Sequence, residues 1–261
     1  MSPFYVPGAY LIAGSGFKDV ERIVDSLGSG RAFGWHEHDR DLFIGTEKLF
    51  RPGYAANLVD HWIPALDGVE DKLRTGAKVA DIGCGLGAST ILMAEAYPQS
   101  TFVGFDYHDA SIALARTAAA SAGVTDRVRF EIASADDFPG DGYDLVATFD
   151  CLHDLGDPAG AARHVRASLA SGGTWMIVEP MAGERLEDNN NPVGKIFYAA
   201  STFICTPASR AQRVGAALGA QTPERTLREI VTDAGFARFR RATETPFNRI
   251  LEASMPAGRS V

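Results

Sequence analysis

Regular alternation of apolar and amphipathic segments begins near Lys78 and constrains the fold of this chain more than any other feature. Five apolar segments have the pattern of buried strands, at 77–83, 100–106, 127–134, 143–150 and 173–180. Helical patterns separate several of them, at 88–98, 109–123 and 158–170. Strands that alternate with helices pair in parallel through right-handed crossovers. The sequence therefore predicts an α/β fold built on a doubly wound sheet.

The end of the chain is expected to add two strands to this sheet. Residues 237–254 show two alternating patterns hinged at Pro246, which predicts an antiparallel hairpin. The sheet is then seven-stranded and mostly parallel, within a core domain of residues 77–261. Ahead of the last helix and the hairpin, residues 181–222 interrupt the alternation with a polar stretch and an apolar helical pattern. We expect this insert to form a lid at the ligand edge of the sheet.

Residues 1–76 precede the first strand and are expected to form an N-terminal helical cap. Two helical patterns lie there, at 17–28 and 46–66. The second pattern is broken at Pro52 and Gly53, because proline removes a helical hydrogen bond and clashes with the preceding turn. The break predicts two shorter helices in place of one long helix.

Composition limits the classes of function. The net charge of the 261 residues is −8, and only the short segment 237–243 is rich in arginine, so nucleic acid is not expected as a partner. The apolar runs are shorter than the roughly 20 residues that span a bilayer. We therefore expect no membrane association and a cytoplasmic location. The cysteines, Cys84, Cys151 and Cys205, are widely spaced, which favours free thiols over a disulfide framework or a zinc site.

A glycine-rich loop follows the first predicted strand. The segment VADIGCGLGAST (79–90) places Gly83, Gly85 and Gly87 at a strand-to-helix turn, where backbone N–H groups can approach a ligand. With Asp106 about 20 residues beyond, the loop also satisfies the dinucleotide-binding fingerprint. A nicotinamide-dependent oxidoreductase is therefore one alternative.

Asp81 argues against the dinucleotide-binding interpretation, because it extends the glycine loop to D-x-G-x-G-x-G. This resembles motif I of the class I S-adenosylmethionine-dependent methyltransferases, in which the acid helps to hold the methionine part of the cofactor. Three later segments match that family in order: FVGFDYH, ASADDFP and LASGGTWMIVEP. The resemblance covers residues 77–180 and the terminal hairpin, and it implies S-adenosylmethionine as the cofactor.

The resemblance also implies roles for individual residues. Asp106 would chelate the ribose hydroxyls, with Phe105 and Tyr107 flanking the adenine. In ASADDFP, an acid would contact the adenine amino group and an apolar residue would pack on the ring. The set expected at the cofactor is Asp81, Gly83, Cys84, Gly85, Gly87, Phe105, Asp106, Tyr107, Ala135, Asp136, Asp137, Phe138, Phe149 and Asp150.

At finer grain, GWHEHDRDLFIGTEKLFRPGYAANLV and FRRATETPFN resemble a group of bacterial methyltransferases that often carry an N-terminal winged helix. The chain begins at MSPFYVPGAY, where such a module would already have ended, so no DNA-related role is expected. The formation of a homodimer stays open, because the winged helix would supply a dimer interface.

An acceptor pocket is expected where the cap and the insert meet the sheet. Aromatic side chains there favour a small, partly aromatic acceptor. Their ring faces would also attract the positive charge of the cofactor's sulfonium. The predicted pocket residues are Trp35, Phe50, Arg51, Tyr54, Phe197 and Tyr198. Arg51 is a candidate partner for an acceptor carboxylate. No metal is expected, because His36 and His38 lack a third ligand at a definable spacing.

His153 follows the fourth core strand, within FDCLHDLGDP (149–158). The segment CLHDLGD resembles the C-H-D-x-x-D segment of plant small-molecule O-methyltransferases, in which this histidine removes the acceptor proton. Imidazole suits that role because its ordinary pKa of about 6.5 leaves it mostly neutral at pH 7. The alternatives are that His153 lines the pocket or is purely structural. Asp154 and Glu179 are its candidate partner acids.

These features predict an enzyme that transfers the methyl group of S-adenosylmethionine to a small-molecule acceptor. A hydroxyl oxygen is the primary expectation for the accepting atom, and nitrogen or carbon is the alternative. The rival from another class is a regulatory or sensor protein that binds S-adenosylmethionine without turnover.

Overall fold

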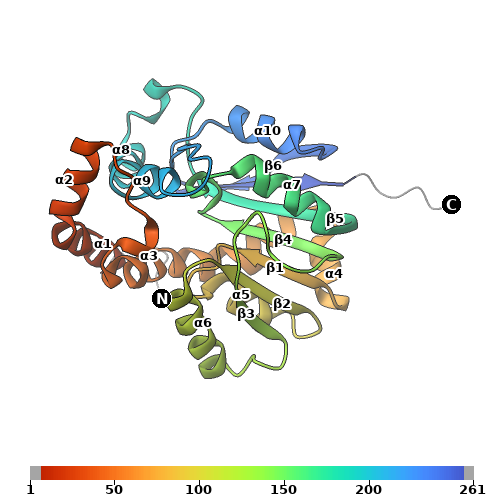
Figure 1. Ribbon diagram of the computed structural model, residues 1–261. Coiled ribbons are helices and arrows are strands. Elements are labelled where there is room, and N and C mark those ends of the chain that lie inside the picture. Colours follow the sequence, from red (N-terminus) through yellow and green to blue (C-terminus); the bar gives the residue numbers. More distant parts are fainter. Residues whose placement is uncertain (1–6, 256–261) are drawn as a thin grey trace.

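The computed structural model describes residues 7–255, which form a sheet with helices on both faces (Figure 1). Seven strands lie in the order β3-β2-β1-β4-β5-β7-β6. Their bounds are β1 Lys78–Ile82, β2 Thr101–Asp106, β3 Val128–Ile132, β4 Tyr143–Phe149, β5 Leu169–Pro180, β6 Arg238–Glu244 and β7 Asn248–Ser254. The first five strands pair in parallel, and β7 is antiparallel to both β5 and β6. The predicted seven-stranded sheet with a C-terminal hairpin is confirmed.

Two buried clusters hold helices against the two faces of the sheet. One face carries α4 Val69–Thr75, α5 Ala88–Ala96 and α6 Asp109–Ala122, and the other carries α7 Pro158–Ser168 and α10 Glu224–Asp233. Neighbouring residues of β1 enter different clusters, since Val79 packs with Leu73 of α4 and Ala80 belongs to the cluster of Leu227 of α10. Strand alternation explains this division, because successive side chains point to opposite faces of a sheet.

The N-terminal residues form helices at the carboxyl end of the parallel strands. Their bounds are α1 Pro7–Lys18, α2 Val20–Ser29 and α3 Arg40–Asn57, followed by a π-helical turn at Leu58–Trp62 and a 3₁₀ turn at Ile63–Ala65. The helix predicted over 17–28 is divided at Asp19, a buried residue whose carboxylate accepts a hydrogen bond from the Asp39 N–H at 2.8 Å. α1 and α3 approach closely at Gly8 and Gly45, where a Cβ on Gly8 would overlap the carbonyl oxygen of Gly45.

The predicted break at Pro52 and Gly53 is wrong. α3 continues through Pro52, which is buried, and the irregular backbone begins only after Asn57. A proline in a helix costs about 3 kcal/mol. Packing of α3 on α1 along one side and on α5 along another offsets that cost, so tertiary contacts override the local preference.

The segment 181–222 consists of short helices and turns. It contains a 3₁₀ turn at Leu186–Asn189, α8 Pro192–Ala200, a π-helical turn at Ser201–Cys205 and α9 Thr206–Arg210. In Figure 1, α8 and α9 lie at the same end of the sheet as α1 to α3. None of the helices within residues 7–255 combines the length and apolar character needed to cross a membrane.

Candidate active site

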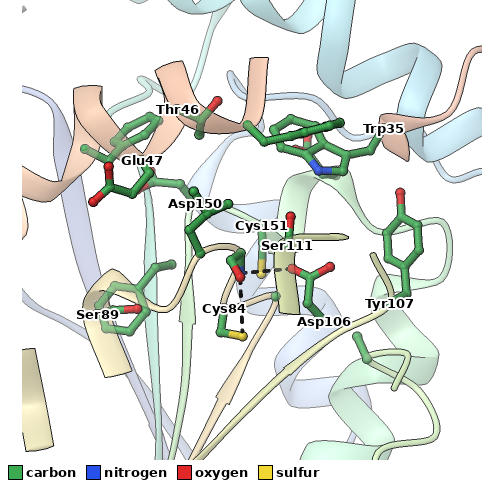
Figure 2. A pocket seen from close by; sticks show the side chains of 18 of the residues that line it. Trp35, Thr46, Glu47, Cys84, Ser89, Asp106, Tyr107, Ser111, Asp150 and Cys151 are labelled. Atoms are coloured by element: carbon green, nitrogen blue, oxygen red, sulfur yellow. Dashed lines mark hydrogen bonds between the residues drawn. The ribbon is translucent and has the colours of Figure 1, made fainter. Parts of the chain in front are cut away.

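A pocket opens at the carboxyl ends of β1, β2 and β4, beside helix α3 (Figure 2). Its empty space is about 1090 Å³, including volume open to solvent. In Figure 2, Thr46 and Glu47 of α3 lie across the pocket from Cys84 and Asp106. Because parallel strands end at one edge of the sheet, the loops that follow them meet there, as in other open α/β folds.

The glycine loop has a backbone that side chains would disturb. Gly83, Gly85 and Gly87 have φ angles of +70°, +52° and +82°, in the left-handed region. A Cβ on Gly87 would lie 2.5 Å from Cζ of Phe130, and one on Gly83 would lie 2.7 Å from Sγ of Cys151. A Cβ on Gly85 would meet no atom within 4 Å. The loop therefore packs tightly behind Gly83 and Gly87, while Gly85 borders open space in the pocket.

Asp106 joins the end of β2 to this loop. Its Oδ2 accepts a hydrogen bond from the Gly85 N–H at 2.9 Å, and its Oδ1 accepts one from the His108 N–H at 2.9 Å. Burial raises the pKa of Asp106, and the two N–H donors oppose that rise. Each carboxylate oxygen can accept a second hydrogen bond. Asp106 lines the pocket, so its carboxylate can accept donors from a ligand.

Asp81 lies deeper than predicted and does not line the pocket. It is fully buried, and its Oδ2 accepts hydrogen bonds from Ser89 Oγ at 2.6 Å and Thr90 Oγ1 at 2.7 Å. Its Oδ1 has no partner. Burial raises the pKa of Asp81 to about 6, although the two hydroxyl donors lower it. Asp81 fastens the first turn of α5 to β1 and keeps one acceptor oxygen free.

The residues predicted around the adenine divide into two groups. Tyr107 and Ala135 line the pocket, whereas Phe105 and Phe138 are buried and pack on each other with ring centroids 5.3 Å apart. The predicted adenine contacts of Phe105 and Phe138 are therefore corrected to core packing. Strand alternation explains Phe105, because its side chain points to the cluster of α7 and α10, opposite to that of Phe102.

The two acids of ASADDFP also lie outside the pocket lining. Asp136 accepts a hydrogen bond from Ser134 Oγ at 2.8 Å and pairs with Arg213 at 2.9 Å. Asp137 is exposed. Asp136 therefore has partners on the protein surface, and the contact of either acid with the adenine stays a prediction.

One face of α3 forms the opposite wall of the pocket. Phe43, Glu47, Phe50 and Tyr54 recur at helical spacing and all line it, together with Trp35. Trp35, Phe50 and Tyr54 line this pocket, and their contact with an acceptor stays a prediction. The sequence analysis did not include Glu47 in the pocket, although its spacing of three and four residues from pocket aromatics was a usable signal.

Three predicted pocket residues lie elsewhere. The Arg51 side chain is 57% exposed, and its Nε lies 3.6 Å from Oε1 of Glu47. Phe197 and Tyr198 are half-buried in α8 and do not line the pocket. The C-terminal part of the insert contributes Ala208 and Gln212 instead. No local sequence pattern marks these two residues as pocket residues.

Asp150 connects three elements at the centre of the site. Its φ of +50° lies in the left-handed region, which is strained for a residue with a side chain. Its Oδ2 accepts a hydrogen bond from Tyr54 Oη at 2.7 Å, and its Oδ1 accepts one from Asn248 Nδ2 at 2.8 Å. Burial raises the pKa of Asp150 to about 7, although the Tyr54 hydrogen bond lowers it. Asp150 and the neighbouring Phe149 line the pocket, as predicted.

His153 is buried between its two candidate partner acids. Its Nδ1 lies 2.7 Å from Oε2 of Glu179, whose Oε1 accepts a hydrogen bond from the Leu152 N–H at 2.9 Å. Its Nε2 lies 3.1 Å from Oδ1 of Asp154, but that oxygen has no aligned hydrogen bond. Asp154 lines the pocket, whereas His153 lies behind it.

The two acids determine the charge of the His153 ring. Burial lowers the pKa of His153, but the carboxylates of Asp154 and Glu179 raise it more, to well above the ordinary value. The prediction that the imidazole is mostly neutral at pH 7 is therefore wrong. The two carboxylates thus favour the protonated form of the ring, which Glu179 holds at Nδ1 and Asp154 approaches at Nε2.

Potential metal ligands lie close together at one place in the part of the chain that the structure describes. Cys84, Cys151 and Cys205 are free. Ligand atoms of His153, Asp154 and Cys205 lie within 4.8 Å of one another, a spacing compatible with a cation. His36 packs edge-on against Tyr107 with centroids 6.1 Å apart. His38 is instead buried, with its Nδ1 3.2 Å from Asp19.

Comparison with known proteins establishes the class of this chain. Residues 73–231 match the family model described as a methyltransferase domain. The chain belongs to the methyltransferase domain family. Within this methyltransferase, the matched segment begins in α4 and ends in α10, so it contains the glycine loop, Asp106 and the loop of His153.

Several known methyltransferases are similar to it. The ubiquinone biosynthesis O-methyltransferase of Bordetella parapertussis is 31% identical over 156 residues, 58% of each chain. A solved O-methyltransferase family protein of Burkholderia thailandensis has a TM-score of 0.70 at 18% identity, covering 95% of this chain and 72% of that one. Human N-acetylserotonin methyltransferase, solved in complex with SAM, has a TM-score of 0.65 at 14% identity and covers 92% and 67%.

These similarities confirm the predicted class I methyltransferase fold. The solved structures, at less than 25% identity, support the fold alone. The matches span between 24% and 58% of the length of the curated relatives.

Proposed function

We propose that this methyltransferase transfers the methyl group of S-adenosylmethionine to a hydroxyl oxygen of a small, partly aromatic molecule. The observation that carries this proposal is a single pocket that combines the glycine loop and Asp106 on one side with the aromatic face of α3 on the other. Methyl transfer requires the donor and the acceptor in line and in contact. A pocket with two chemically distinct walls supports such a ternary complex.

The glycine-loop side is suited to the cofactor. Asp106 would accept hydrogen bonds from the two ribose hydroxyls, because its oxygens keep free lone pairs beside their backbone donors. Tyr107 and Ala135 border the space next to Asp106 and would flank the adenine. The free Oδ1 of Asp81 is buried behind the pocket lining and would act on the methionine part through a bridging water.

The α3 side is suited to a flat acceptor. Trp35, Phe43, Phe50 and Tyr54 supply rings that bury apolar surface of a bound aromatic molecule. The nucleophilic oxygen would then lie near Asp150 and Asp154, between this wall and the glycine loop.

For proton removal we propose the His153–Glu179 pair. Glu179 holds Nδ1 of the ring, so Nε2 is the nitrogen that exchanges a proton with the pocket. Asp154 must move before Nε2 can reach an acceptor. Such a movement is feasible because the Asp154 side chain is 23% exposed and makes no aligned hydrogen bond with the ring. Because the neighbouring carboxylates raise the pKa of His153 and so favour its protonated form, turnover should increase as the pH rises.

The test combines binding with turnover. Titration calorimetry should show binding of S-adenosylmethionine and its demethylated product and no binding of NAD. Incubation with a panel of phenols and enols should then yield O-methylated products, identified by NMR. Binding of S-adenosylmethionine without turnover on any hydroxyl would instead support a sensor. Products methylated at nitrogen or carbon would show that the accepting atom is not oxygen.

The insert 181–222 is proposed as a lid over the acceptor. It contributes Ala208 and Gln212 to the pocket, and Gln212 donates from Nε2 to the Asp154 carbonyl oxygen at 2.9 Å. Bound cofactor and acceptor should therefore slow limited proteolysis within the insert. Unchanged cleavage at saturation would contradict a lid.

A homodimer through α1 and α2 is a further part of the proposal. Tyr10, Phe17, Val24 and Leu27 are apolar side chains on these helices and are 77%, 81%, 62% and 58% exposed. Large exposed apolar side chains that gather on neighbouring helices are typical of an association surface. Light scattering should give twice the chain mass, and Phe17→Glu should give the mass of one chain.

A further inference from the structure

We infer that the acceptor carries a positive charge, as a protonated amine does, on the part that lies against α3. This inference rests on the proposed methyl transfer and specifies the substrate class of the same pocket. The pocket lining contains four carboxyl side chains and, among the described residues, no lysine or arginine. Those carboxyl groups belong to Glu47, Asp106, Asp150 and Asp154.

Three of these acids already have a function or a partner. Asp106 is occupied by two backbone N–H groups and is assigned to the ribose. Asp154 Oδ1 lies 3.1 Å from Nε2 of His153. Asp150 accepts hydrogen bonds from Tyr54 and Asn248, and burial favours its protonated form.

Glu47 is the remaining acid, and its partner within the protein is weak. Arg51 lies 3.6 Å away, but its side chain is 57% exposed, whereas that of Glu47 is 23% exposed. Pairs with an exposed partner contribute little, because water and salt screen them. Burial raises the pKa of Glu47, and the charges of Arg51 and Lys48 lower it by less, so these two cations offset the desolvation of the carboxylate only in part. A cationic ligand group supplies a further counter-ion.

The neighbours of Glu47 reinforce this preference. Phe43 and Phe50 lie one helical turn before and after it on the same face of α3, and the rings of Phe50 and Tyr54 stack with centroids 6.1 Å apart. Aromatic faces attract ammonium groups. A carboxylate beside aromatic rings is therefore chemically suited to an amine, and it repels an acceptor that bears a carboxylate or a phosphate.

The same arrangement corrects an expectation from the sequence. Arg51 was the candidate partner for an acceptor carboxylate, but it is largely solvated and lies outside the pocket lining. Arg213 lies nearby at the surface and pairs with Asp136 instead. Neither arginine offers its charge to the pocket interior.

The experiment compares phenols that share a two-carbon chain and carry at its end an ammonium group, no further group or a carboxylate. Tyramine, 4-ethylphenol and 3-(4-hydroxyphenyl)propionate are titrated into the full chain saturated with S-adenosylhomocysteine, at pH 8 and low salt. We expect the amine to bind about 5- to 20-fold more tightly than the neutral phenol, and the carboxylate to bind most weakly. Salt should reduce the preference for the amine.

Two variants test whether Glu47 is the source of the preference. Glu47→Gln keeps the shape of the side chain and should reduce the amine preference at least threefold, as about 0.7 kcal/mol of charge pairing is lost. Asp60→Asn removes an exposed acid from the turn after α3 and should leave the preference unchanged. Binding of S-adenosylhomocysteine to both variants verifies that they are folded.

The outcomes separate this inference from the proposed function. Equal affinities, tighter binding of the carboxylate, or no binding of the amine would overturn the inference even if neutral phenols are methylated. An amine preference that depends on Glu47, without any O-methylation, would uphold the inference and overturn O-methyl transfer. Methylation at the amine nitrogen would also uphold the cationic site while changing the accepting atom.

Discussion

Asp106→Asn is expected to weaken S-adenosylmethionine binding by about 2 to 4 kcal/mol, and the structure accounts for this magnitude. The proposed ribose contacts are two hydrogen bonds to a charged acceptor, each contributing about 1.5 to 3 kcal/mol. Part of the loss is regained, because the introduced amide keeps one oxygen that can accept a hydrogen bond from one hydroxyl or from the Gly85 N–H. The remaining loss corresponds to an increase in Kd of roughly 30- to several hundredfold.

Calorimetric titration with S-adenosylmethionine measures this change directly. Asp109→Asn is the matched control, because Asp109 is an exposed acid at the start of α6 that does not line the pocket. Circular dichroism and thermal unfolding should show that the Asp106 variant keeps its fold. A folded Asp106→Asn protein with the affinity of the wild type would refute the ribose assignment and the orientation of the cofactor built on it.

Three further predictions concern proton removal, pH and the glycine loop. His153→Ala should lower kcat on a hydroxyl acceptor by about 10²- to 10⁴-fold with nearly unchanged cofactor affinity, and a loss below about tenfold would leave His153 a structural residue. Burial raises the pKa of Asp150 to about 7 in the folded state, so its protonated form stabilises the fold at low pH and this stabilisation is lost as the pH rises toward 7. In urea unfolding, the free energy of unfolding should fall less between pH 5 and pH 8 in Asp150→Asn than in the wild type. Gly87→Ala should lower the free energy of unfolding by more than about 2 kcal/mol, because φ is +82° and Phe130 blocks the Cβ, whereas Gly53→Ala, with open space inside α3, should be neutral or stabilising in the same melts.

The fold could be predicted because its signals are local and repeated. Each core strand has a continuous apolar run, and the hairpin alternates around Pro246, so the parallel pairing and the antiparallel end of the sheet followed from connection rules. The continuity of α3 could not be predicted in this way. It depends on contacts with α1 and α5, which lie distant in sequence, and these outweigh the local effect of Pro52.

The pocket residues that could be predicted from the sequence are those at or just after the end of a strand. Gly85 lies in the loop after β1, Asp106 is the last residue of β2, and Asp150 comes directly after β4; all three line the pocket. Phe138 follows a strand at greater distance, and its loop turns it into the core. The ionisation state of His153 needed coordinates, because it depends on Glu179, 26 residues away, as well as on the adjacent Asp154.

The most direct test of the central claim follows the methyl group itself. The protein is incubated with S-adenosylmethionine carrying a ¹³C-labelled methyl group and with the phenolic amine that binds most tightly, and the products are followed by NMR. We expect an O-methyl ¹³C signal that grows in equal amount with S-adenosylhomocysteine and is absent in Asp106→Asn at limiting cofactor. Label that stays on the sulfonium with every hydroxyl acceptor, while the cofactor is bound at saturation, would contradict this expectation.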